Sequence, residues 1–172
     1  MIVGLANPIN EYNHTRHNVG AWFLQVLAQH QNKYFIKEKQ FFGFTSHISF
    51  LNKKIFLLIP NIYMNINGAS VLAMSSYYKI SLNNILIVHD ELDLLPGKIK
   101  FKVGRGHNGH NGLRNIIKVF SEIISFSRIS IGIGRPTTKK EVAKFVLSSP
   151  TQEEHVVINK IIKQTVKELI FT

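Results

Sequence analysis

Cysteine is absent from this chain of 172 residues, and acidic residues are scarce. Without cysteine the protein has no disulfide bond and no thiolate metal site, and nothing indicates an oxidising compartment. No apolar run approaches the roughly 18 residues that a membrane span needs. The first segment, Met1–Leu5, is typical of a strand and lacks the pattern of a secretory signal. We therefore expect a cytoplasmic protein that does not enter a membrane.

The charge balance is strongly basic. Only 10 Asp and Glu residues oppose 21 Lys and Arg residues, which gives a formal net charge of +11. The excess is spread along the chain, which favours a folded domain with a positive face over a basic tail. Such an excess is typical of proteins that bind nucleic acid. The alternative explanation of the positive charge is a bias towards lysine from an AT-rich genome.

Strand and helix patterns alternate along the chain, which predicts a single α/β domain over residues 1–172. Apolar spacing predicts helices at residues 19–30, 67–78, 113–120, 139–147 and 151–171, and strands at residues 1–5, 42–50, 54–59, 84–89, 98–103 and 127–133. Only Leu51-Asn52-Lys53 separates the second and third strands, so these two must pair antiparallel. We expect a twisted mixed sheet flanked by helices.

Polar side chains gather where the apolar segments end. The most informative run, Val88 to Asp93, follows a buried-strand pattern and reads VHDELD. In an open α/β sheet, ligands bind at the carboxyl ends of strands. Four further polar groups precede helices or follow strands: Asn7, His17, Asn65 with Asn67, and residues 107–111. If the sheet gathers these ends on one edge, they form a cleft with a histidine, a carboxylate and several carboxamides.

This set of groups fits hydrolysis at a carbonyl carbon. A neutral imidazole can take a proton from water, and a carboxylate on its other nitrogen fixes the tautomer. Carboxamide groups can donate to a developing oxyanion. Ser46, Ser70 and Ser75 lack the sequence context of a nucleophile elbow, so direct attack by water is the simpler hypothesis. Plainer interpretations are that Asn65 caps the next helix and that Asp90 is a turn residue.

Spaced motifs over nearly the whole chain resemble bacterial peptidyl-tRNA hydrolases. The matching segments are, in order, residues 2–8, Tyr12, residues 15–18, 39–44, 63–65 with Gly68, 89–93, 96–97, Gly106-His107, residues 109–113 and 131–134. The resemblance implies a monomeric enzyme that needs no metal or other cofactor. Its substrate would be peptidyl-tRNA, and cleavage of the ester between peptide and tRNA would recycle tRNA from interrupted translation.

The resemblance also implies roles for the polar groups at the strand ends. His17 would be the general base that activates water, and Asp90 would orient and polarise it. Asn7 and Asn65 would bind the peptide or stabilise the tetrahedral intermediate. Asn111 would help to place the water and the substrate backbone.

Further residues would contact the substrate according to the same resemblance. Met64 would form a wall of the peptide cleft, and Tyr12 would lie near the 3′ end of the tRNA. Lys100, Lys102 and Arg128 would face the tRNA acceptor arm. Contacts to phosphates would hold many tRNAs without reading their sequence.

Several positions depart from the pattern of the family. Ile9 replaces a common glycine after Asn-Pro, and Arg105 and Asn108 replace glycines in the loop before the helix at residue 113. Ser130 stands where many members carry a second arginine that grips phosphate. The chain ends at Thr172, earlier than typical relatives, which we expect to weaken the grip on tRNA.

Two other classes of function fit parts of the sequence. A metal-dependent phosphodiesterase would use ligands drawn from His89, Asp90, Glu91 and Asp93 with His107 or His110. Neighbouring residues on a strand point to opposite faces, which weighs against this set. A non-catalytic RNA-binding module would bind tRNA without cleaving it.

Overall fold

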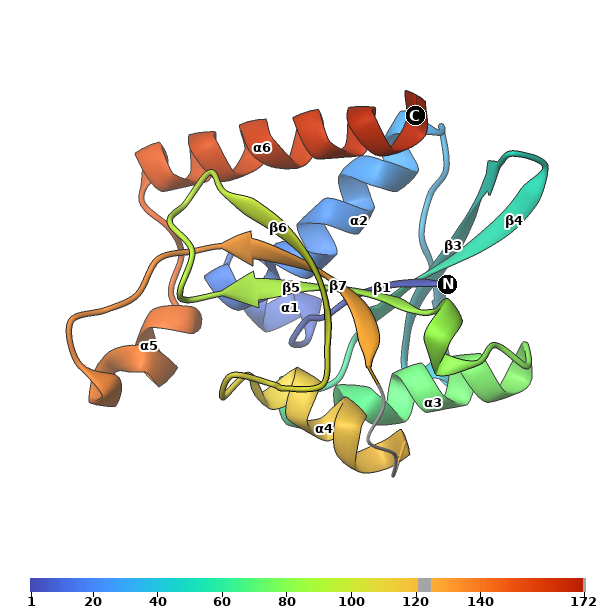
Figure 1. Ribbon diagram of the computed structural model, residues 1–172, viewed down its shortest axis with the longest axis horizontal. Coiled ribbons are helices and arrows are strands. Elements are labelled where there is room, and N and C mark those ends of the chain that lie inside the picture. Colours follow the sequence, from blue (N-terminus) through green and yellow to red (C-terminus); the bar gives the residue numbers. More distant parts are fainter. Residues whose placement is uncertain (121–124, 172) are drawn as a thin grey trace.

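Seven strands form one mixed sheet in the computed structural model, which describes residues 1–120 and 125–171 (Figure 1). The strand order is β2-β3-β4-β1-β5-β7-β6. The strands are β1 Ile2–Gly4, β2 Ile36–Glu38, β3 Gly43–Phe50, β4 Lys53–Pro60, β5 Leu86–Glu91, β6 Ile99–Gly104 and β7 Phe126–Gly132. The helices are α1 Ile9–Tyr12, α2 Val19–His30, α3 Asn67–Tyr77, α4 Asn111–Phe120, α5 Val142–Val146 and α6 Gln152–Phe171. The predicted α/β class with a mixed sheet is confirmed.

The centre of the sheet is parallel. Strands β4, β1, β5 and β7 all run in one direction, whereas β2, β3 and β6 complete the sheet by antiparallel pairing. The predicted hairpin between β3 and β4 is present, and its turn residues Leu51 and Asn52 both have left-handed backbone angles. The parallel centre brings four carboxyl ends to one edge of the sheet, where polar side chains can meet.

Helices cover both faces of the sheet (Figure 1). Helices α2 and α6 lie on one face, and α3 and α4 lie on the other. Helix α6 buries Ile158, Ile162 and Val166, whose spacing of four residues places them on one stripe. Burying each such side chain contributes about 1.5–3 kcal/mol. The amphipathic pattern therefore determines which face each helix turns to the sheet.

Some predicted boundaries were wrong. Strand β5 continues through His89 and Asp90 to Glu91, because these residues pair with β7 from Ser130 to Gly132. The helix expected over residues 139–147 is a short 3₁₀ turn, Lys139–Glu141, followed by α5. Strand β2 and helix α1 are too short to show a clear sequence pattern. None of the helices in the described residues is long and apolar enough to cross a bilayer, and Thr172 lies outside those residues.

Candidate active site

A cleft of about 280 Å³ opens at the carboxyl edge of the parallel strands. Its lining residues are His17, the end of β5 and the turn after it (residues 89–92), the loop and helix start at residues 107–111, and the wall residues Lys139, Val142, Ala143 and Val146. The three apolar wall residues had no distinguishing sequence signal, because apolar residues of a short helix are most simply core. The cleft gathers several of the polar groups expected at this edge.

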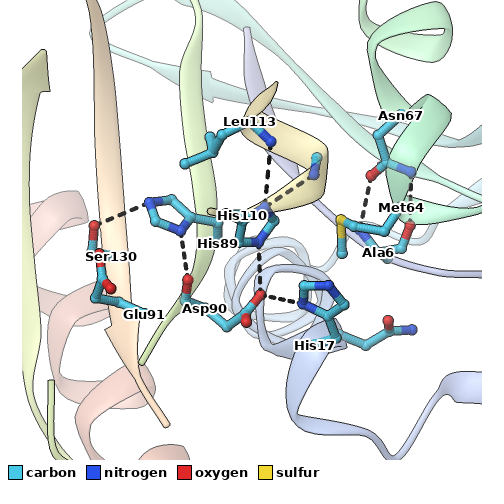
Figure 2. Close-up of polar contacts among 12 residues, drawn as sticks. Ala6, His17, Met64, Asn67, His89, Asp90, Glu91, His110, Leu113 and Ser130 are labelled. Atoms are coloured by element: carbon cyan, nitrogen blue, oxygen red, sulfur yellow. Dashed lines mark hydrogen bonds and ion pairs between the residues drawn. The ribbon is translucent and has the colours of Figure 1, made fainter. Parts of the chain in front are cut away.

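His17 and Asp90 both line this cleft and meet there, although 73 residues separate them in the chain. The distance from His17 Nδ1 to Asp90 Oδ1 is 2.8 Å, and both side chains are buried (Figure 2). A carboxylate only accepts hydrogen bonds, so His17 donates from Nδ1. The lone pair of the neutral ring is then on Nε2, which is the nitrogen that can take a proton.

Two glycines explain how His17 reaches Asp90. His17 lies in a 3₁₀ turn, Arg16–Asn18, that leads directly into α2. A methyl group on Gly20 of α2 would lie 2.5 Å from the carbonyl oxygen of Val88, and one on Gly4 of β1 would lie 2.2 Å from the carbonyl oxygen of Gly20. The start of α2 therefore packs backbone against backbone on β1 and β5, beside Asp90.

His110 is a second donor to the same carboxylate oxygen. Its Nε2 lies 2.9 Å from Asp90 Oδ1, and the backbone N–H groups of Gly112 and Leu113 donate to its Nδ1 (Figure 2). These two donors require a lone pair on Nδ1, so the proton of the neutral ring is on Nε2. The sequence placed His110 in a candidate loop but gave no indication that it would share Asp90 with His17.

The two histidines keep Asp90 ionised. Burial alone would raise the pKa of Asp90, but the interactions with His17 and His110 outweigh this effect and hold the pKa well below its ordinary value. The carboxylate therefore carries a negative charge inside the protein. A charge in this position stabilises an imidazolium on His17 when the ring takes up a proton.

His89, next to Asp90, also lines the cleft, and its ring lies edge-on to the ring of His110. Its Nδ1 donates to the carbonyl oxygen of Asp90 over 2.6 Å, and Ser130 Oγ donates to its Nε2 over 3.0 Å (Figure 2). Burial, with a smaller contribution from nearby His110, lowers the pKa of His89 to about 3. His89 is thus a neutral, buried residue, and the hydroxyl of Ser130 is engaged with it rather than with solvent.

Asn7, which follows β1, is held from several directions. Asn18 Oδ1 accepts the backbone N–H of Asn7 over 2.9 Å, and Asn18 Nδ2 donates to the carbonyl oxygen of Asn7 over 3.1 Å. The side-chain Oδ1 of Asn7 accepts the backbone N–H of Met64 over 2.8 Å. Within the described residues, the buried Nδ2 of Asn7 has no acceptor. A buried donor without a partner is costly, and an acceptor supplied by a ligand would satisfy it.

A second carboxamide, Asn67, joins the segment after β1 to the segment after β4. Its Nδ2 lies 3.0 Å from the carbonyl oxygen of Ala6 and 3.1 Å from those of Ile62 and Tyr63, and its Oδ1 accepts the N–H of Ala6 (Figure 2). Asn67 is completely buried. Sequence alone could not reveal this role, because asparagine near a helix start is usually a cap.

The other residues expected to bind the substrate differ in burial and in position. Asn65 is exposed in the 3₁₀ turn Met64–Ile66, and it does not cap α3, whose N-cap position is Ile66. Asn111 is the exposed first residue of α4 and lines the cleft. Met64 is buried, and the half-buried ring of Tyr12 lies edge-on to the ring of Tyr63.

The three basic residues expected to contact tRNA differ in exposure. Lys100 and Lys102 are exposed on β6, where they lie opposite Ser130 and Arg128 of β7. Arg128 is only 2% exposed and its Nη1 donates to the carbonyl oxygen of Gly106 over 2.5 Å. The guanidinium therefore contacts the loop that leads to His110, whereas the lysines are directly available to a polyanion.

Three side chains could in principle hold a metal ion. The ligand atoms of His17, Asp90 and His110 lie within 4.8 Å of one another. A neutral histidine that binds a metal through Nε2 carries its proton on Nδ1, but Nδ1 of His110 faces two N–H donors. The hydrogen bonds thus fit a proton network better than a metal site. Of the ligand set considered from the sequence, Asp90 and His110 meet, whereas His89 bonds to Ser130 and Asp93 pairs with Arg135 on the surface.

A mixed sheet with a polar cleft at the carboxyl edge of its parallel strands is an architecture found in many α/β enzymes. The family model for peptidyl-tRNA hydrolase matches residues 1–172. Peptidyl-tRNA hydrolase of Buchnera aphidicola (subspecies Acyrthosiphon pisum, strain 5A) is 52% identical over 172 residues, which cover 100% of this chain and 97% of that protein. Peptidyl-tRNA hydrolase of Pectobacterium atrosepticum is 46% identical over 167 residues, with coverage of 97% and 86%.

Solved structures lead to the same assignment. The crystal structure of peptidyl-tRNA hydrolase from Acinetobacter baumannii superposes with a TM-score of 0.91 at 40% identity, over 98% of this chain and 86% of that chain. Its Arg119Gln mutant gives a TM-score of 0.92 at 39% identity, with coverage of 98% and 85%. The chain belongs to the peptidyl-tRNA hydrolase family and is accordingly a hydrolase.

Proposed function

We propose that this enzyme cleaves the ester between a peptide and the 3′ end of tRNA by direct attack of water, with His17 as the general base. The observation that carries the proposal is the hydrogen bond from His17 Nδ1 to Asp90. It leaves the lone pair on Nε2 of a residue that lines the cleft. Recycling of tRNA from interrupted translation then follows from the reaction itself, and we propose that the chain acts as a monomer.

The proton moves twice in this mechanism. His17 Nε2 takes a proton from water as the water oxygen attacks the ester carbonyl, and the negative charge of Asp90 stabilises the imidazolium that forms. The tetrahedral intermediate collapses when the bond to the 3′ oxygen of the tRNA breaks. That oxygen receives the proton back from His17, so the free peptide acid, the tRNA hydroxyl and the neutral histidine are restored. No covalent intermediate with the enzyme is needed.

Carboxamides position the substrate beside this base. The unpartnered Nδ2 of Asn7 is a donor for the ester oxyanion or for a peptide carbonyl. Asn111 lines the cleft and places the water and the substrate backbone. Asn65, exposed next to Met64, binds the peptide further along. Backbone contacts of this kind accept any peptide sequence.

The tRNA lies over the exposed basic residues. Lys100 and Lys102 of β6 face its acceptor arm, and Tyr12 lies near its 3′ end. Arg128 acts from beneath, by holding the carbonyl of Gly106 in the loop that leads to the cleft. Contacts to phosphates supply affinity without sequence preference.

The test is peptide release from a defined N-acetyl-aminoacyl-tRNA by wild type and His17→Ala, each with and without a chelator. We expect His17→Ala to lose about 10²- to 10⁴-fold in kcat, the usual contribution of a general base. His14→Ala is the matched control, because His14 is an exposed histidine three residues away, and it should retain wild-type activity. Near-normal turnover by His17→Ala would refute the proposed base, and loss of wild-type activity with chelator would favour a metal mechanism.

A further inference from the structure

Arg16, the residue before the proposed base, is buried and connects distant parts of the chain. It is 5% exposed. Its Nη1 donates to Ser148 Oγ and to the carbonyl oxygen of Ser149, each over 2.7 Å, and its Nη2 lies 2.5 Å from Glu154 Oε2. These partners lie 132 to 138 residues further along the sequence. The hydrolytic mechanism gives Arg16 no part, so this concentration of contacts calls for another explanation.

The contacts of Arg16 surround the short helix α5. The Arg16 Cζ atom lies 4.2 Å from the centre of the Phe145 ring of α5, and the backbone N–H of Arg16 donates to the carbonyl oxygen of Ser148 over 3.0 Å. Three other residues of α5, Val142, Ala143 and Val146, line the cleft. A helix of five residues is not stable by itself, so its position depends on such tertiary contacts.

We propose that Arg16 is a positioning residue that holds α5 as one wall of the peptide cleft. It fastens the wall to the turn that carries His17, so the cleft keeps the width that a peptide chain needs. The proposal rests on the proposed function, because it assumes that the peptide occupies this cleft. A planar guanidinium suits the task, since its fork reaches several acceptors in fixed directions, whereas the ammonium of lysine is a single point of contact.

Three variants distinguish the contributions of the individual Arg16 contacts. Arg16→Lys keeps the positive charge but cannot reach the serine acceptors and the carboxylate together. Glu154→Gln removes the charge of the ion pair with Arg16 and keeps a side-chain oxygen that can accept the backbone N–H of Thr151. Glu153→Gln is the matched control, because Glu153 is an exposed acid in the same first turn of α6 and changes the net charge equally.

The first readout is steady-state hydrolysis of two substrates, an N-acetyl-aminoacyl-tRNA and a tripeptidyl-tRNA. Arg16→Lys should raise KM for the tripeptidyl substrate about tenfold and change kcat less than about twofold, the signature of lost binding without lost chemistry. The rise should be smaller for the N-acetyl substrate, which reaches less of the wall. The pH–rate profile should not move. Glu154→Gln should have an intermediate effect, and the double variant should be no worse than Arg16→Lys.

The second readout is amide hydrogen exchange, which needs no substrate. Exchange over residues 142–149 should become faster in Arg16→Lys, while the central strands stay protected. Unchanged exchange together with unchanged KM would overturn the proposal. A fall in kcat with a shifted pH profile and an unchanged KM would also overturn it, by placing the effect on His17. Inactive wild-type enzyme would refute the proposed function instead, and the exchange measurement would then still decide whether Arg16 holds α5.

Discussion

Replacing Asp90 with asparagine removes one negative charge and leaves the shape of the side chain almost unchanged. In the wild type, a single oxygen accepts N–H groups from His17 at 2.8 Å and from His110 at 2.9 Å. An amide oxygen can still accept both, so we expect the fold to persist. The change therefore isolates the charge of Asp90 from its geometry.

The distance between the two groups sets the size of the effect. At 2.8 Å and an effective dielectric constant of about 20, the attraction between the carboxylate and an imidazolium on His17 is about 6 kcal/mol. That value is an upper limit and corresponds to about 10⁴-fold in rate. If only the difference between a charge-assisted and a neutral hydrogen bond is lost, the effect is about 1.4 kcal/mol, or tenfold. We expect a fall in kcat between these limits, about 10- to 10⁴-fold.

The assay is single-turnover cleavage of N-acetyl-aminoacyl-tRNA, with thermal unfolding measured on the same samples. Asp93→Asn is the control, because Asp93 follows β5, is exposed and pairs only with an exposed arginine among the described residues. It should keep the wild-type rate within about twofold, as most surface substitutions do. If Asp90→Asn is folded and retains more than about a tenth of the wild-type rate, the charge is not what stabilises the transition state, and the reasoning fails.

Two further predictions concern pH and salt. The pKa of His89 falls from its ordinary 6.5 to about 3 in the folded protein, so its stabilising contribution is complete above pH 6.5 and is lost as the pH falls towards 3. Between pH 7 and pH 4, the free energy of unfolding measured with denaturant should fall by up to about 1.4 kcal/mol per pH unit because of this residue. His89→Asn should make that part of the plot of unfolding free energy against pH flatter. An equal slope in both proteins would contradict the assignment. For tRNA binding, replacing Lys100 and Lys102 with glutamine should reduce the slope of log Kd against log salt by roughly 0.7–0.9 per lysine. The same change at Lys53 and Lys54, in the hairpin of β3 and β4, should leave it unchanged, and a slope that responds equally to both pairs would argue against β6 as the tRNA face.

Much of the scaffold follows from the sequence because its signals are local. Helix α2 was predicted at its observed bounds from apolar spacing, and the β3–β4 hairpin was predicted from the three-residue gap between its strands. The approach of His17 to Asp90 was also expected, because the carboxyl ends of parallel strands share an edge.

The remainder depends on contacts that no local pattern encodes. Strand β5 runs on through charged residues because β7 pairs with it, and Arg128 is buried although arginine usually indicates surface. The carboxamides of Asn18 and Asn67 hydrogen-bond to the backbone of the segment after β1, yet in the sequence they resemble ordinary turn residues. His110 shares Asp90 because the loop before α4 places its ring beside the end of β5.

The backbone contact between Gly4 and Gly20 has a consequence for how this enzyme can vary. Neither residue needs to touch a substrate, yet adding one carbon atom to either would push the start of α2 off the strands beneath it. The distance between His17 and Asp90 would change before the fold as a whole was lost. Substitutions that reduce activity should therefore include interior positions that lie outside the catalytic groups.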